Sequence, residues 1–199
     1  MISADEALAR LTEGNKRFLA GQRGQDAQET RLRRAQVAND QDPFAIILGC
    51  SDSRVPAEMV FDQGLGDLFV IRVAGNIVAP SQIGSIEFAA AKFNTHLVVV
   101  LGHTQCGAIL ATIDELQQDT DEQSPNLRSI VDRVRPAVEP LLADDDDDIV
   151  GKAVRANVHA SVDNLKHGSE ILEELIDLGK LCIVGAEYSL ETGRVEFLD

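Results

Sequence analysis

The sequence has 199 residues, of which none is tryptophan, one is tyrosine and three are cysteine. Three cysteines are too few for the disulfide framework of a small secreted domain. Basic residues are also scarce, with 18 against 33 acidic ones, and the resulting net charge of −15 argues against nucleic-acid binding and against binding to an anionic membrane surface. No apolar run approaches the ~18–20 residues that span a bilayer. Because residues 1–6 also lack the pattern of a signal peptide, we expect a cytoplasmic protein.

The length and the hydrophobic content of 44% fit a single domain with a substantial core. Short apolar runs without polar alternation are typical of strands that are covered on both faces of a parallel sheet. Such runs occupy residues 44–50, 68–73, 97–102 and 181–185, and residues 195–198 are expected to form an edge strand. Helical patterns lie between them, at 83–92, 107–118, 125–134, 154–165 and 171–176. This alternation predicts an α/β fold around a mostly parallel sheet.

The N-terminal segment has the pattern of a helix. Ser3 and Glu6 have the spacing of a capping box, and leucines follow at helical intervals until Gly21 and Gly24 end the pattern. A second, basic helix is expected at 31–38.

Two features are expected to have no catalytic role. Cys182 lies in an apolar run and is predicted to be an inert, buried thiol. The five consecutive carboxylates of residues 144–148 repel one another, and we interpret them as a solvated loop rather than a cation site.

Polar residues of the same kind follow two of the predicted strands. Cys50 and Asp52 come after the first strand, and His103 and Cys106 come after the third. In an open α/β sheet functional groups gather at the carboxyl ends of the strands, so these four side chains are expected to meet if the two strands are neighbours. Two thiolates, an imidazole and a carboxylate are the ligands that zinc prefers. The sequence therefore predicts a zinc site.

Other interpretations of the same residues remain open at this point. The pair of thiols could form a redox centre, although no Cys-x-x-Cys motif supports it. Another interpretation is a nucleophilic cysteine that uses His103 as its base. Arg54 adds a further choice, because it can hold Asp52 away from the metal and leave one coordination position open. An open position is typical of a catalytic site and a closed one of a structural site.

The two motifs, in the segments CSDSRVPAEMVFDQGLGDLFVIRVAGN and VVVLGHTQCGAI, resemble those of the β-class carbonic anhydrases. The resemblance covers residues 5–199 and includes GNKRF near the start and GAEYSLETGRVEF at the end. It implies a reversible hydration of carbon dioxide to bicarbonate and a proton. Cys50, His103 and Cys106 would hold one zinc ion per chain. Asp52 and Arg54 would form a dyad that orients zinc-bound hydroxide, with Asp52 as fourth ligand in a closed form.

The resemblance also implies a Rossmann-like fold that works as a homodimer or homotetramer. The chain would be one domain over residues 1–199, with a helical arm at 1–40 that embraces the neighbouring subunit and a catalytic core at 41–199. Three residues match substrate-binding positions of the family. Gln41 would act from the adjoining subunit, Phe69 would form an aromatic wall, and Gly107 would donate its backbone N–H.

The resemblance leaves alternatives open. Carbonyl sulfide or carbon disulfide hydrolysis would use the same ligands, and a non-catalytic zinc-stabilised or bicarbonate-sensing protein would keep Asp52 on the metal. The bicarbonate-regulated branch of the family has a tryptophan where this chain has Ile47, so we expect the open form at neutral pH. His159 and His167 are candidate proton shuttles.

Overall fold

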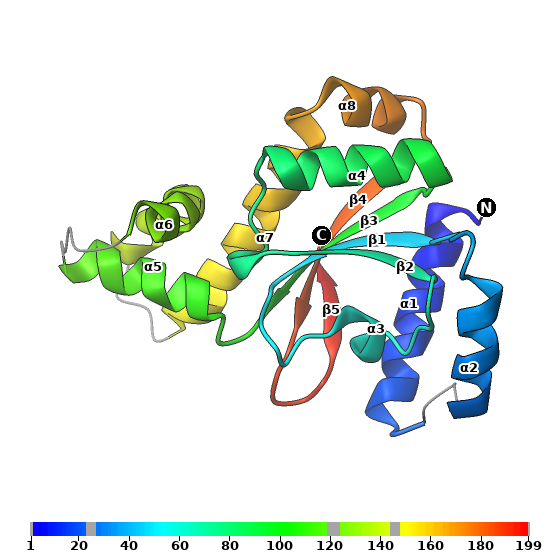
Figure 1. Ribbon diagram of the computed structural model, residues 1–199. Coiled ribbons are helices and arrows are strands. Elements are labelled where there is room, and N and C mark those ends of the chain that lie inside the picture. Colours follow the sequence, from blue (N-terminus) through cyan, green and yellow to red (C-terminus); the bar gives the residue numbers. More distant parts are fainter. Residues whose placement is uncertain (1, 23–26, 119–123, 144–147, 199) are drawn as a thin grey trace.

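The computed structural model describes residues 2–22, 27–118, 124–143 and 148–198. It contains a five-stranded sheet with the strand order β2-β1-β3-β4-β5 (Figure 1). The strands are β1 (Ala45–Gly49), β2 (Leu68–Arg72), β3 (Leu97–His103), β4 (Cys182–Tyr188) and β5 (Val195–Leu198). The first four strands are parallel, and β5 pairs with β4 in the antiparallel direction. The predicted α/β fold with a mostly parallel sheet and an edge strand is confirmed.

Helices surround the sheet. In chain order they are α1 (Ala4–Leu19), α2 (Ala27–Gln36), α3 (Ala57–Val60), α4 (Pro80–Phe93), α5 (Gly107–Gln118), α6 (Pro125–Val138), α7 (Ile149–His167) and α8 (Glu170–Asp177). Two short 3₁₀ turns, η1 (Ala74–Asn76) and η2 (Glu139–Ala143), complete them. α4, α7 and α8 lie on one side of the sheet and α1 and α3 on the other, while α5 and α6 extend beyond its end (Figure 1).

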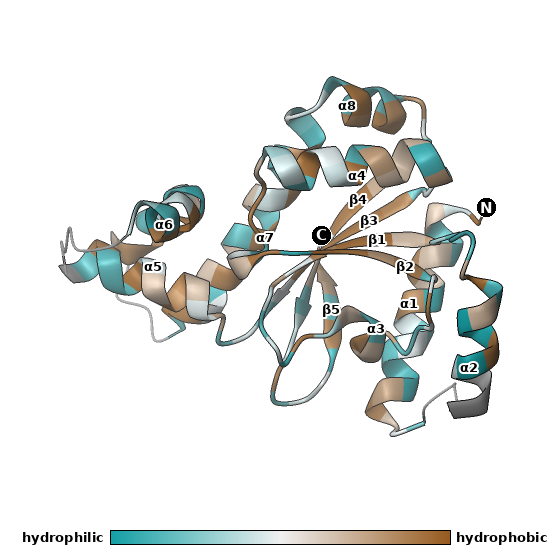
Figure 2. Cartoon of the chain, viewed as in Figure 1, coloured by the Kyte–Doolittle hydropathy of each residue, from teal (hydrophilic) through white to brown (hydrophobic). Residues whose placement is uncertain are grey.

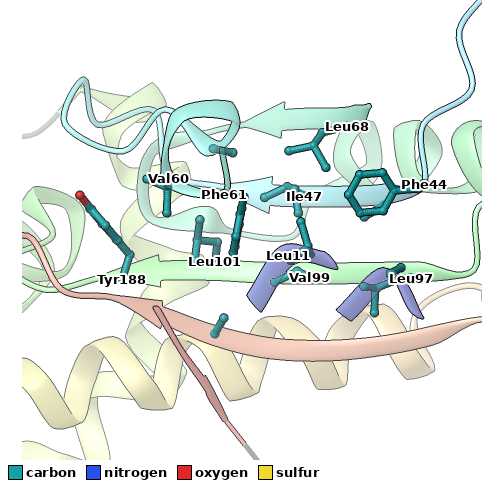
Figure 3. Close-up of a cluster of buried hydrophobic side chains, with 14 of the residues drawn as sticks. Leu11, Phe44, Ile47, Val60, Phe61, Leu68, Leu97, Val99, Leu101 and Tyr188 are labelled. Atoms are coloured by element: carbon teal, nitrogen blue, oxygen red, sulfur yellow. The ribbon is translucent and has the colours of Figure 1, made fainter. Parts of the chain in front are cut away.

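Successive side chains of the central strands point to opposite faces of the sheet, and they form one hydrophobic core on each face. All five residues of β1 are buried, which explains why its sequence is continuously apolar. Ile47 points toward α1 and α3, whereas Ile46 and Leu48 point toward α4 and α7. Figure 2 shows the resulting hydrophobic sheet, and Figure 3 shows Leu11 of α1 packed among the side chains of the first core.

The chain order of the strands creates a switch point between β1 and β3. The chain leaves β1 toward β2 on one side and leaves β3 toward β4 on the other. In open α/β sheets a crevice opens at such a point, outside the carboxyl ends of the two strands, and binding sites lie there. Residues that directly follow β1 and β3 are therefore placed together.

The N-terminal arm begins as predicted and packs against its own chain. The Ser3 side chain accepts a hydrogen bond from the Glu6 backbone, and the Glu6 carboxylate accepts one from the Ser3 backbone, which confirms the capping box. The Asn15 side chain donates to the carbonyl oxygens of Val60 and Gly193, at 3.0 and 2.9 Å. That α1 embraces a neighbouring subunit stays a prediction.

One prediction is wrong. Cys182 is exposed, because it is the first residue of β4 and its side chain points away from the face on which Ile183 enters the core. The acidic run lies outside the described residues at 144–147, and Asp148 forms the N-cap of α7. Among the described residues no helix is both long and apolar enough to cross a membrane.

Candidate metal centre

Three potential metal ligands meet at the switch point of the sheet. Cys50 directly follows β1, His103 is the last residue of β3, and Cys106 immediately precedes α5. β1 and β3 are hydrogen-bonded neighbours, with Gly49 opposite Leu101. The pairing of two parallel strands thus fixes the relative positions of residues that are more than fifty positions apart in the sequence.

The geometry of the three side chains fits a zinc ion. Their ligand atoms all lie within 4.8 Å of one another, and the two sulfurs are 4.0 Å apart. Two sulfurs bound to one tetrahedral zinc would be about 3.8 Å apart. The His103 side chain is fully buried, and its Nε2 atom has no hydrogen-bond partner among the described residues. A buried polar atom without a partner is costly, and a metal ion would remove that cost.

The second nitrogen of His103 fixes the orientation of the ring. Nδ1 lies 2.9 Å from the Thr104 carbonyl oxygen. A carbonyl oxygen only accepts hydrogen bonds, so Nδ1 carries the proton and Nε2 keeps its lone pair toward the two sulfurs. Metal-binding histidines in proteins are held in the same way.

The cluster attracts positive charge. A hydrogen bond from the Cys106 thiol lowers the pKa of Cys50, with further help from His103 and from backbone N–H groups. The same pairing with Cys50 raises the pKa of Cys106, because one proton is held between the two sulfurs. Burial opposes protonation of His103, but the nearby Cys50 sulfur and the Thr104 carbonyl oxygen outweigh burial and raise its pKa. A bound dication would replace these protons and ionise both thiols.

Asp52 and Arg54 form an ion pair beside the three ligands. Arg54 Nε donates to Asp52 Oδ1 at 2.9 Å, and Nη2 donates to Oδ2 at 2.7 Å. The Arg54 backbone N–H also donates to Oδ1, at 2.9 Å. These bonds hold the pKa of Asp52 well below its usual range. Asp52 Oδ2 lies 3.9 Å from His103 Nε2, so the carboxylate borders the candidate metal position while both its oxygens are bound by Arg54.

Two residues make contacts with the site that were not foreseen from the sequence. Arg72, at the end of β2, donates to the carbonyl oxygens of Cys50 and Asp52 at 3.0 and 2.6 Å. The Gly75 backbone N–H donates to the Cys50 sulfur at 3.4 Å. The register that places Arg72 opposite Gly49 could have indicated the first contact, but the sequence does not reveal this register.

The three residues predicted to bind substrate lie in two places. Gly107 is the first residue of α5 and directly follows Cys106. Gln41 precedes β1 and lines a surface hollow of about 550 Å³ that includes Phe93. Phe69 of β2 packs against the rings of Phe93 and Phe88, with centroids 6.1 and 6.2 Å away. Gln41 and Cys50 are at opposite ends of β1, so one chain does not bring Gln41 to its own metal centre.

The two candidate proton shuttles lie on α7. Both His159 and His167 are exposed. The His167 ring contacts the Asp163 carbonyl oxygen of its own helix, with Nδ1 at 3.0 Å. A shuttle role for either histidine stays a prediction.

Comparison with known proteins identifies the family. The carbonic anhydrase family profile matches residues 45–195. Carbonic anhydrase 2 of Mycobacterium tuberculosis is 43% identical over 190 residues, which cover 95% of this chain and 90% of that protein. The solved structure of the β-carbonic anhydrase CcaA matches with a TM-score of 0.77 and 26% identity, over 96% of this chain and 95% of that one. The chain belongs to the β-class carbonic anhydrases.

A further relative concerns assembly. The crystal structures of two tetrameric β-carbonic anhydrases from the ascomycete Sordaria macrospora give a match with a TM-score of 0.71 and 26% identity. The match covers 86% of this β-class carbonic anhydrase and 88% of that chain. Together with the family profile and the mycobacterial relative, this match confirms the family that the two motifs predict.

Proposed function

We propose that the protein catalyses the reversible hydration of carbon dioxide to bicarbonate and a proton, with one zinc ion per chain held by Cys50, His103 and Cys106. The observation that carries this proposal is the convergence of two sulfurs and the free Nε2 atom within 4.8 Å, beside an ion-paired carboxylate. Membership in the carbonic anhydrase family supports it independently.

When bound, zinc would act as a Lewis acid and would make water a nucleophile near neutral pH. The chain's own contribution centres on Asp52. This carboxylate, whose pKa Arg54 holds well below its usual range, stays ionised and would accept a hydrogen bond from the attacking water at Oδ2, which orients an oxygen lone pair toward carbon dioxide. Arg54 fixes the carboxylate in one orientation through two side-chain hydrogen bonds and favours the open form, because both oxygens of Asp52 are already bound.

The apolar surroundings of the ligands fit an uncharged substrate. Ile109 and Val154 pack with Cys50 and Cys106 in one buried cluster, which keeps the local dielectric low. In such surroundings the Gly107 N–H would stabilise the charge that develops on the substrate oxygens.

Gln41 and Phe69 are proposed to act on the metal centre of an adjoining subunit. Both residues border Phe93 and therefore lie on one surface of the chain, at a distance from its own ligands. A homodimer or homotetramer would allow this surface to face the partner's site. The tetrameric Sordaria enzymes support such an assembly. The cytoplasmic location is proposed because thiol ligands persist best in a reducing compartment.

No specific observation favours the alternative functions. The relatives described above are named carbonic anhydrases, which supports neither carbonyl sulfide nor carbon disulfide as the main substrate. A permanently closed, non-catalytic site would need Asp52 on the metal, whereas Arg54 binds both of its oxygens.

The test is stopped-flow carbon dioxide hydration on protein of known zinc content. We expect about one zinc per chain and a rate that rises from about pH 6.5 to about pH 9, because two thiolates donate more charge to zinc than imidazoles do and so reduce its acidifying effect on water. Full zinc occupancy without hydration in this range would refute the proposal, and carbonyl sulfide and carbon disulfide would then be tried as substrates.

A further inference from the structure

We infer that Asn157 of α7 is a positioning residue for the metal ligand Cys50, and that it acts through the backbone of the η1 turn, residues 74–76. The inference rests on the proposed function in taking Cys50 as a ligand. Asn157 and its neighbour Ser161 do not themselves touch the ligands in any described contact. They hold the turn whose backbone N–H bonds the Cys50 sulfur.

The first step is the contact between the turn and the ligand. The Gly75 N–H donates to Cys50 Sγ at 3.4 Å. A hydrogen bond of this kind reduces the charge that a thiolate donates to its metal, and it orients the sulfur. Gly75 also contacts the other ligand loop, because a Cβ at this position would lie 3.0 Å from the Cβ of Ala108, two residues after Cys106.

The second step is the conformation of the turn. Gly75 has a φ of 71° and the next residue, Asn76, has a φ of 43°. Two consecutive residues in the left-handed region are unusual, and although asparagine tolerates this conformation better than other non-glycine residues, it is still less favourable than the right-handed one. Such a turn keeps its shape only where its surroundings hold it.

The third step is the set of bonds that hold the turn. Asn157 Nδ2 donates to the Gly75 carbonyl oxygen at 2.8 Å, and Ser161 Oγ donates to the Asn76 carbonyl oxygen at 3.1 Å. Both α7 side chains are buried, with exposed fractions of 2% and 3%.

The two polar residues stand out on the buried face of α7. Val154, Val158 and Val162 on this face are apolar and pack in the core. Burying an amide and a hydroxyl among them costs free energy unless each has a partner. Here the partners are the carbonyl oxygens of two successive peptide units, Gly75–Asn76 and Asn76–Ile77. The Gly75 N–H that bonds Cys50 belongs to the preceding unit, Ala74–Gly75, so Asn157 and Ser161 position this N–H by holding the turn that carries it.

The test compares Asn157→Ala and Ser161→Ala with Asn164→Ala, which alters an exposed asparagine of the same helix. The purified, zinc-loaded proteins are mixed with a chromophoric chelator, and the rate of zinc release is measured next to the thermal melting curve. Cobalt-substituted samples report the sulfur–metal charge-transfer band. We expect Asn157→Ala to release zinc about tenfold faster and to shift the band, because loss of a group that holds a metal ligand in place commonly weakens metal binding by that factor or more.

Ser161→Ala should show a smaller change in the same direction, and Asn164→Ala should behave like the unaltered protein. Unchanged release and an unchanged cobalt band in Asn157→Ala, with only a lower melting temperature, would show a merely structural role and overturn the inference. If Asn157→Ala does not fold, Ser161→Ala decides by the same two readouts. An unaltered protein that holds no zinc would instead refute the proposed function.

Discussion

At the residue scale, the position of one carboxylate decides whether the metal site is open, as in an enzyme, or closed, as in a protein that the metal only stabilises. Asp52 borders the candidate metal position, with Oδ2 3.9 Å from His103 Nε2, and a small movement would make it a fourth ligand. Arg54 opposes that movement with two side-chain bonds and one backbone bond to the carboxylate. The arginine side chain is half-exposed, so its own position depends on few other contacts.

Arg54→Ala is expected to reduce kcat/KM for carbon dioxide hydration about 100-fold or more while zinc content stays near one per chain. The reason is that Asp52 loses its fixed orientation and is free to approach the metal, and the loss of a positioned hydrogen-bond acceptor for the attacking water costs about that factor. Stopped-flow kinetics and metal analysis on the same sample check both parts.

Arg54→Lys is the informative companion. A lysine keeps the positive charge but cannot bind both oxygens in a planar pair, so we expect most of the activity loss to remain. Arg133→Ala, which removes an exposed arginine of α6, serves as the control and should retain the native rate. A fully active, zinc-loaded Arg54→Ala protein would contradict the role given to the dyad.

At the scale of elements, α1 is held against the sheet by a close approach of backbones. A side chain on Gly14 would overlap the Phe61 carbonyl oxygen just after α3, so only glycine permits the observed distance. The next residue, Asn15, also accepts a bond from the Val195 backbone at 3.0 Å, which ties α1 to β5. The GNKRF segment therefore contains the docking contacts of this helix.

Gly14→Ala is expected to destabilise the fold by about 1–3 kcal/mol, since the added methyl group must displace the backbone of a neighbouring element. Gly84→Ala on α4 provides the matched comparison, because nothing lies within 4 Å of its added Cβ. That change should be stabilising by about 0.5–1 kcal/mol through helix propensity. Urea unfolding of both variants measures the difference, and equal stabilities would mean that α1 does not pack closely at Gly14.

Some of these elements follow from local patterns. The buried strands, the capping box of α1 and the start of α6 at Pro125 are encoded in neighbouring residues, and all were predicted. The cluster of Cys50, His103 and Cys106 was predicted because each residue ends an apolar strand or begins the helix after it, and parallel strands align such ends.

Other features depend on how distant elements pack. The bonds from Arg72 to the Cys50 loop need the register of β1 and β2, and the bonds from Asn157 to Gly75 need the rotation of α7 about its axis. Cys182 was misjudged because an apolar neighbourhood in sequence does not reveal to which face the first residue of a strand points. These features are properties of tertiary structure.

At the scale of the whole molecule, the metal centre joins segments that are far apart in the chain. Cys50 belongs to the β1 loop, while His103 and Cys106 belong to the crossing from β3 to α5. A metal ion bound here favours only the folded state, because the unfolded chain does not hold these ligands together.

Removal of the metal with a strong chelator is therefore expected to lower the melting temperature by about 5–10 °C. Adding back one equivalent of zinc should restore it, whereas magnesium should not, because thiolate ligands do not suit a hard cation. Differential scanning calorimetry gives the comparison. A melting temperature that does not respond to chelation, in protein shown to have lost its zinc, would argue that the metal contributes nothing to the fold.

The exposed position of Cys182 has a practical consequence. Of the three thiols one is open to solvent, and the other two are the buried candidate ligands. A thiol-specific dye should therefore titrate about one group per chain in fully loaded native protein, and a second and third only as metal is withdrawn or the chain unfolds. The absorbance of the dye would then report the fraction of metal sites that are occupied in any preparation. Fully loaded Cys182→Ser protein, which has no exposed thiol among its described cysteines, would give the zero point.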